Sequence, residues 1–178
     1  MDVVQLLLDQ HAHIKELLQK VVDTSGKDRA AAFFDLRRML AVHETAEEEI
    51  VHPRVRRDLG DGDPIADARI REERAAKQQL VELESLDVDS AEFVEKFADL
   101  RAAVLSHAQA EESEEFPLLE DELGDKQLER MTAAVRLAES VAPTRPHPGL
   151  ELGGEHALAG PFAAMLDRAR DLIAKPGR

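Results

Sequence analysis

The segment HETAEEEIVHP at residues 43–53 is repeated as HAQAEESEEFP at residues 107–117. The histidine, the central pair of glutamates and the proline stay in register between the two copies. A weaker match precedes each copy, between residues 11–15 and residues 73–77. An internal repeat of this kind indicates that each half of the chain is one supersecondary unit. The repeat therefore predicts a pseudo-symmetric bundle made of two helical hairpins.

The composition agrees with a helical fold. The chain has 178 residues, with six Phe and no Tyr or Trp, and it is rich in Leu, Ala, Glu, Arg and Val, which favour helices over sheets. This length suits one domain with a sizeable core, or one domain with a small appendage. We therefore expect an all-α protein, an antiparallel up-down four-helix bundle with additional C-terminal helices.

Glycine, proline and capping residues mark where the helices begin and end. Pro53 and Pro117 fall inside or near the ends of the second and fourth helices, and we expect them to kink or end those helices. A Pro- and Gly-rich strap is expected at 142–154. The expected helices cover approximately residues 2–24, 27–59, 63–86, 90–123, 125–140 and 160–174.

These boundaries divide the chain into two parts. Residues 1–123 are expected to form the four-helix bundle. Residues 124–178 are expected to form a C-terminal helix, the strap and a last helix that pack on the bundle.

Each bundle helix carries polar side chains within its apolar stripe. On the second helix, apolar and polar residues follow one another in steps of three and four, which keeps them on one helix face. A buried carboxylate without a partner costs several kcal/mol, so carboxylates and imidazoles that converge in one core need cations to balance them. We therefore expect a site for two metal ions, with the ligands His11, His43, Glu47, Glu73, His107 and Glu111.

The spacing of such pairs is weak evidence by itself. His147 and Glu151 have the same spacing, yet they lie among Pro and Gly, away from any expected helix. The placement of six groups on four apolar stripes, repeated in register, is the stronger argument. The alternative is a metal-free core in which Glu–His pairs satisfy one another, and it requires a full set of partners for every group.

The types of donor narrow the choice of metal. The chain has no cysteine, so no thiolate site exists. Mixed imidazole and carboxylate donors suit Fe or Mn, whereas structural Zn usually recruits Cys. We expect two iron ions with an oxo or hydroxo bridge, with Mn or Zn as substitutes.

The charge and the N-terminal segment bear on partners and location. The formal net charge of −14 argues against binding to nucleic acid and to an anionic membrane surface. The first residues have no basic region, and the apolar run there is too short for a signal peptide. We expect a cytoplasmic protein whose small-molecule partner is a diatomic gas or a peroxide, and we predict no particular protein partner.

The motifs Gln10-His11, His43-x-x-x-Glu47 and His107-x-x-x-Glu111, the latter two continuing to a proline, resemble those of the haemerythrin-like HHE cation-binding family. The resemblance covers residues 1–123. It implies a di-iron site in which Glu47 and Glu111 are bridging carboxylates, His11 and His43 bind one iron, and His107 binds the other. It also implies binding of dioxygen, or a response to nitric oxide, peroxide or iron.

The sequence departs from the family pattern at two positions. Glu73 stands where the family usually has His in the third helix, and Lys77 stands where oxygen carriers have a second His. More anionic ligands stabilise the ferric state, so reversible oxygen carriage is not expected. The departures favour oxidation, peroxide or nitric oxide chemistry, or metal holding. Glu73 is expected to ligate metal, and its alternative is a pair with Lys77 one turn further on.

Several other residues near these motifs have ordinary interpretations. His13 is expected at the surface, and Glu48 and Glu112 are expected to be solvated. His147 on the strap and His156 just after it are weaker candidates, as distal ligands or gates of the site. His52 is expected to be a packing residue, because its mate in the repeat is Phe116, with a hydrogen bond to a ligand as the alternative.

The expected function is that of a non-haem di-iron protein that handles hydrogen peroxide, dioxygen or nitric oxide. Peroxidase-like, catalase-like or nitric-oxide-related turnover is compatible with such a site. One alternative is a gas or redox sensor, or an iron-holding protein, without turnover. The other is a structural bundle in which the metal serves stability only.

Overall fold

The chain is described by a computed structural model over residues 1–58, 60 and 62–141. The expected strap at 142–154 and the expected helix at 160–174 lie outside the described residues. Within the described part every regular element is helical, and two of the elements are single π-helical turns, η1 and η2. The elements are α1 (Val3–Asp23), α2 (Gly26–Ala46), η1 (Glu47–Val51), α3 (His52–Asp58), α4 (Gly62–Glu84), α5 (Ala91–Ala110), η2 (Glu111–Glu115), α6 (Phe116–Glu122) and α7 (Asp125–Val141).

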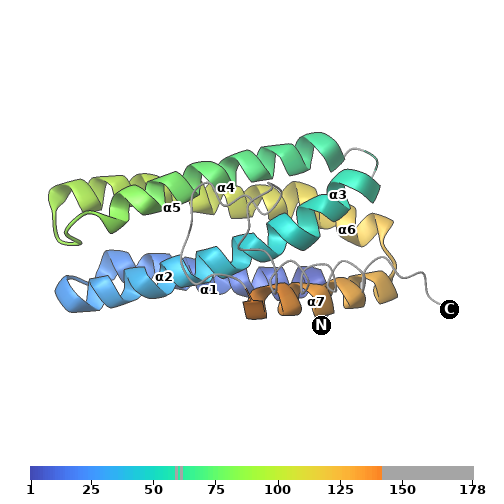
Figure 1. Ribbon diagram of the computed structural model, residues 1–178, viewed down its shortest axis with the longest axis horizontal. Helices are drawn as coiled ribbons and strands as arrows, with labels where there is room; N and C mark the ends of the chain where they lie inside the picture. Colours follow the sequence, from blue (N-terminus) through green and yellow to red (C-terminus); the bar gives the residue numbers. More distant parts are fainter. Residues whose placement is uncertain (59, 61, 142–178) are drawn as a thin grey trace.

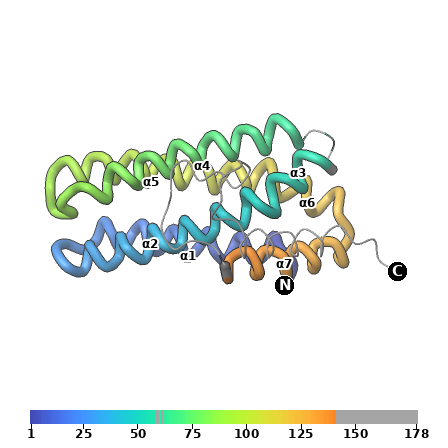
Figure 2. Tube along the Cα trace, viewed as in Figure 1, coloured from blue at the N-terminus to red at the C-terminus, as the bar shows by residue number. Residues whose placement is uncertain are grey.

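The helices form two long hairpins that lie against each other (Figure 1). In the first hairpin α1 packs along α2, which continues through η1 into α3. In the second, α4 packs along α5, which continues through η2 into α6. The trace in Figure 2 follows each of these continuations as one long, bent helix. The expected all-α four-helix bundle with an additional helix is confirmed, and α7 packs against α1, α2 and η1.

Capping interactions set the helix boundaries. The Asp2 carboxylate accepts a hydrogen bond from the backbone N–H of Gln5 at 2.9 Å, and Ser90 Oγ accepts one from Phe93 at 3.1 Å. Gly26 begins α2 with φ of +56°, a conformation that favours glycine. Its N–H donates to the Asp89 carboxylate at 2.9 Å and so ties the turns of the two hairpins together.

The apolar core consists of two separate clusters. One lies toward the turns that join α1 to α2 and α4 to α5, and it contains Phe33, Phe93 and Phe97 with ring centroids 5.1–6.1 Å apart. The other lies toward the opposite end of the bundle, where α7 supplies Met131 and Val135. Between the two clusters, α1, α2 and α4 bury the polar side chains of His11, His43 and Glu73.

The two expected proline kinks take the form of π-helical turns. In each copy of the repeat the turn ends directly before the proline, where the backbone N–H of His52 donates to the Glu47 carbonyl, and that of Phe116 to the Glu111 carbonyl. These are bonds between residues five apart, instead of the usual four. A proline has no N–H to donate, so a widened turn before it lets the chain remain helical without an unfilled α-helical bond.

Among the described residues, no helix is both long enough and apolar enough to cross a lipid bilayer.

The aromatic cluster gives a test of the core. Phe33 is 4% exposed, whereas its neighbour Phe34 is 45% exposed. We expect Phe33→Ala to lower the free energy of unfolding by about 3–5 kcal/mol, because it leaves a cavity between two other rings. Phe34→Ala is the matched control and should cost less than about 1 kcal/mol. Equal losses in urea denaturation would contradict this packing.

Candidate metal centre

A layer of buried polar side chains separates the two apolar clusters. Each of the four long helices contributes to it where its apolar stripe is interrupted. His11, His43, Glu47, Glu73 and Glu111 are each at most 2% exposed, and the His107 side chain is 12% exposed. The structure thus brings together all six residues that the sequence predicts to be ligands.

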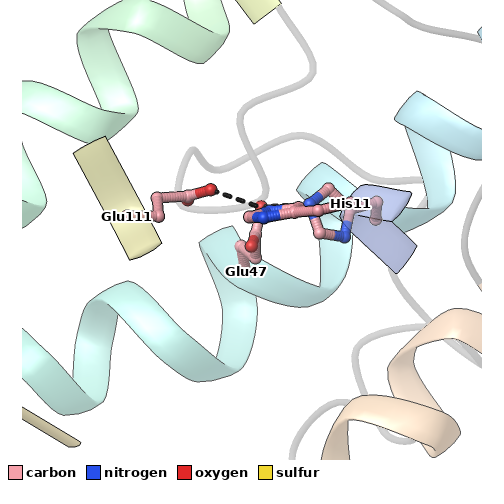
Figure 3. A group of neighbouring side chains, drawn as sticks. His11, Glu47 and Glu111 are labelled. Atoms are coloured by element: carbon pink, nitrogen blue, oxygen red, sulfur yellow. Dashed lines mark ion pairs between the residues drawn. The ribbon is translucent and has the colours of Figure 1, made fainter. Parts of the chain in front are cut away.

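The buried layer contains two groups of four donor atoms. His11, His43, Glu47 and Glu111 form the first tetrad, and Glu47, His52, Glu73 and Glu111 form the second tetrad. Within each tetrad one ligand atom per residue lies within 4.8 Å of all the others. Figure 3 shows His11, Glu47 and Glu111 directed toward one another. Because Glu47 and Glu111 belong to both tetrads, the two groups are adjacent.

Three predicted histidine ligands direct Nε2 at these carboxylates. His11 Nε2 lies 3.1 Å from Glu111 Oε2, and His43 Nε2 lies 3.2 Å from Glu47 Oε2. His107 Nε2 lies 3.2 Å from Glu111 Oε1 and 4.0 Å from Glu73 Oε1.

The other ring nitrogen of each histidine is held by an acceptor. His11 Nδ1 donates to Glu112 at 2.9 Å, and the same Glu112 oxygen accepts from Lys15 at 2.9 Å. His43 Nδ1 donates to the amide oxygen of Gln10 at 2.7 Å. A carboxylate or amide oxygen can only accept, so Nδ1 carries the proton and the Nε2 lone pair of the neutral ring is available to a metal.

His107 follows the same pattern, and the carboxylate that accepts from it is itself paired with an arginine. Its Nδ1 donates to Glu72 Oε2 at 2.9 Å, and the Glu72 carboxylate accepts from Arg69 at 3.0 Å. Arg69 is buried on α4. Each ring is therefore fixed by its Nδ1 contact before any ion binds.

The electrostatics of the layer follow from burial and crowding. Burial, reinforced by Glu111 and Glu73, raises the pKa of Glu47 well above its ordinary value. Burial, reinforced by His11, lowers the pKa of His43 to about 3, so this ring stays neutral. Burial alone would raise the pKa of Glu111, but the His107 and His11 imidazoles hold it well below its usual range. A neutral ring, as in His43, is the protonation state in which a histidine binds a divalent cation.

The hydrogen-bond inventory gives a direct test of whether a cation fits. Several buried atoms in the described residues have no partner with hydrogen-bond geometry, and they face the two tetrads: His11 Nε2, His107 Nε2, Glu73 Oε2 and both oxygens of Glu47 and Glu111. A metal-free core would need a full set of partners for these atoms. A cation bound to them would supply what is missing, so the donor set fits a metal centre.

His52 is the main member of the layer that the sequence pattern did not identify. Its side chain is fully buried, with Nε2 2.6 Å from Glu73 Oε1 and Nδ1 2.9 Å from Glu115 Oε1. Burial alone would lower the pKa of His52, but the carboxylates of Glu73 and Glu115 raise it well above its ordinary value. The expectation of a packing residue is thereby corrected. The α-helical periodicity placed Ile50 on the core face, and η1 shifts the phase so that His52 reaches it as well.

Other expectations about neighbouring residues also change. Glu112 is 23% exposed and bound to His11, and Glu48 is 22% exposed and accepts from Lys77 at 2.6 Å, so neither is simply solvated. Lys77 pairs with Glu48 and lies 3.8 Å from Glu44, which leaves Glu73 to the buried layer.

His13 is 55% exposed, as expected, and His147 and His156 lie outside the described residues.

Comparisons with known proteins agree with this architecture. A sequence model of the Hemerythrin HHE cation binding domain matches residues 2–119. The crystal structure of a Hemerythrin HHE cation binding domain-containing protein from Mycobacterium kansasii superposes with a TM-score of 0.68 at 20% identity, covering 95% of this chain and 99% of that one. A DNA nickase from Nostoc sp. is 25% identical over 161 residues, 90% of this chain, and the matched part is 44% of that relative's length.

The buried titrating groups predict an unusual pH dependence for the metal-free protein. Burial raises the pKa of Glu44 to about 8, and nearby carboxylates, against the effect of burial, raise that of His107 to about 9. Both groups bind protons more tightly in the folded chain, so their contribution is present at low pH and is lost as pH rises through these values. After chelation, the free energy of unfolding should fall by on the order of 5 kcal/mol between about pH 6.5 and 9.

The measurement is urea unfolding across that range, with Glu44→Gln as the comparison. Because this variant lacks the titrating carboxyl, its free energy of unfolding should fall less steeply with pH than that of the wild-type protein. A metal-free protein whose stability rises from pH 6.5 to 9 would show that these groups are not buried as described.

Proposed function

The chain belongs to the Hemerythrin HHE cation-binding family, and from that membership we propose that it is a non-haem protein that holds two iron ions and handles a small oxidant. The oxidant would be hydrogen peroxide, dioxygen or nitric oxide. The observation that carries the proposal is the pair of tetrads that share Glu47 and Glu111.

The shared carboxylates support a two-ion site. Each carboxylate has two oxygens, and those of Glu47 and Glu111 lie in the buried layer without hydrogen bonds. We assign His11 and His43 to one ion, Glu73 and His107 to the other, and Glu47 and Glu111 to both. Carboxylate–histidine dimetal sites of this kind are built from facing helices in bundles.

The proposed metal follows from the donors. Imidazole and carboxylate without thiolate suit Fe or Mn, and we propose iron, with Mn or Zn as substitutes. Bound iron would supply one-electron redox chemistry toward the small oxidant.

The residues of the chain hold the geometry and exclude water. Glu112, Gln10 and Glu72 fix the three imidazoles through Nδ1. The apolar clusters on both sides of the layer and the burial of its carboxylates leave little room beside a bound ion, which favours a small molecule as the substrate. The anionic Glu73 favours the more oxidised, more highly charged state of a bound ion, which argues for oxidant chemistry and against reversible oxygen carriage.

A second candidate is a sensor that responds to the same small molecules without turnover. The Gln10 amide that holds His43 also donates a hydrogen bond to Glu139 on α7. This contact connects a proposed metal ligand to a helix beyond the matched residues 2–119. Rapid peroxide consumption by the iron-loaded protein would favour turnover, whereas slow consumption with a change in α7 would favour sensing.

The activity in the name of the Nostoc relative is not proposed here. The matched part is less than half of that protein. The net charge of −14 also repels a phosphate backbone.

Metal content tests the proposed function directly. After anaerobic loading with ferrous iron, the protein should hold up to two ions per chain, measured by elemental analysis. Glu47→Ala and Glu111→Ala should each lose at least one ion. They should also lose most of the metal-dependent rise in Tm, because an ion bound only to the folded state stabilises it by about 2.7 kcal/mol at a hundredfold excess over Kd.

The control is Glu16→Ala, whose side chain is 80% exposed on α1 and which should keep both ions. A folded wild-type protein that takes up no Fe, Mn or Zn would contradict the proposed function. Full metal content in Glu47→Ala would remove that residue from the ligand set.

Glu73 gives a second test, because it places an anionic side chain where the family usually has a neutral histidine. Glu73→His should keep two irons and raise the reduction potential, since a neutral donor stabilises the ferric state less than an anionic one. Glu73→Ala should weaken one ion selectively. The measurements are elemental analysis and a potentiometric titration, with Glu82→His, on the exposed face of α4, as the control. Unchanged content and potential in both Glu73 variants would place Glu73 outside the ligand set.

A further inference from the structure

We propose that His52 is a ligand of the second ion, bound through Nε2 and oriented by Glu115 through Nδ1. The inference rests on the proposed function, and it adds a ligand that the repeated motif does not contain. The observation behind it is that His52 Nε2 lies with carboxylate oxygens of Glu47, Glu73 and Glu111 in one group within 4.8 Å.

The backbone brings His52 to this place. In η1 the N–H of His52 bonds to the carbonyl of Glu47, five residues earlier, which places the ring beside the glutamate of the repeated motif. A regular α-helix would rotate position 52 away from that face by more than a quarter turn. The π-helical turn therefore converts a residue off the stripe into a member of the buried layer, as such turns often do at functional sites.

The internal repeat shows what His52 replaces. Position 52 corresponds to Phe116, and position 73 corresponds to His11. Phe116 stacks on His11 with ring centroids 5.5 Å apart, and His52 contacts Glu73 in the equivalent arrangement. In the His11–Phe116 pair, the imidazole comes from α1 and belongs to the first tetrad, and the apolar ring comes from position 116 and does not. In the second tetrad the imidazole comes from position 52. The histidine that the family usually has at position 73 of α4 is therefore replaced by His52 of α3.

The Nδ1 contact supports a ligand role. Four histidines contribute to the layer, and all four place Nδ1 on an oxygen acceptor and Nε2 at the carboxylates of the layer. Glu115 does for His52 what Glu112 does for His11. Such partners set the tautomer and orientation of a ligating imidazole, and losing one typically weakens metal binding about 10–100-fold.

The competing explanation is that His52 only bridges Glu73 and Glu115 as a buried ion pair. In that case its removal changes the stability of the folded chain but not the number of ions it binds. The two explanations therefore differ in metal stoichiometry, which can be measured on the full chain.

The experiment compares His52→Phe with the double variant Glu73→His/His52→Phe. The single variant copies the residue of the other half at the equivalent position, and we expect it to bind one ion instead of two. The double variant returns the imidazole to α4, and we expect it to bind two. His13→Phe, an exchange of the same type at an exposed position, is the control and should match the wild-type protein.

The readouts are ions per chain by elemental analysis, competition with a chelator, and Tm with and without metal. Glu115→Gln should keep the fold and weaken the second ion about tenfold or more. If His52→Phe does not fold, the double variant and Glu115→Gln still decide. Two ions bound with unchanged affinity in His52→Phe, only one ion in a folded double variant, or unaltered affinity in Glu115→Gln would overturn the inference. A wild-type protein without metal would instead contradict the proposed function itself.

Discussion

The burial of carboxylates between two apolar clusters is the constraint on which the rest of this structure depends. Six glutamates are buried among the described residues, and Arg69 is the only Lys or Arg buried with them. Water cannot solvate these groups, and hydrogen bonds do not satisfy all of them. The helices must therefore hold imidazoles at fixed distances, and the apolar clusters must stabilise the bundle against the cost of the layer between them.

The sequence was sufficient for the parts of this arrangement that follow regular α-helical geometry. His11, His43 and Glu73 were found because each interrupts an apolar stripe in steps of three or four, and these stripes are buried. The repeat located Glu73, which no metal-ligand motif would have selected. The helix boundaries were also readable, because Asp2 and Ser90 are capping residues of well-understood geometry.

The rest depended on features that periodicity does not contain. His52 was missed because η1 changes the helix phase after Glu47, and the sequence signal for that change, a proline in the same place in both copies, also fits a simple kink. The roles of Glu112 and Gln10 were missed because they arise between helices distant in sequence. Glu112 follows a predicted ligand by one position, and only the packing of α1 against η2 turns it toward His11.

The widened turn also decides what a change in chain length does to this segment. A substitution at Ile50 or Val51 alters one contact in the core. A deletion of one residue between Glu47 and Val51 would leave His52 four residues after Glu47, the spacing of an ordinary α-helical bond, so His52 and α3 would keep their phase relative to α4. In surface loops such a change is commonly tolerated. Here a one-residue deletion removes the extra residue of the π-helical turn, so an alignment that places a gap in this turn compares a regular α-helix with a widened one.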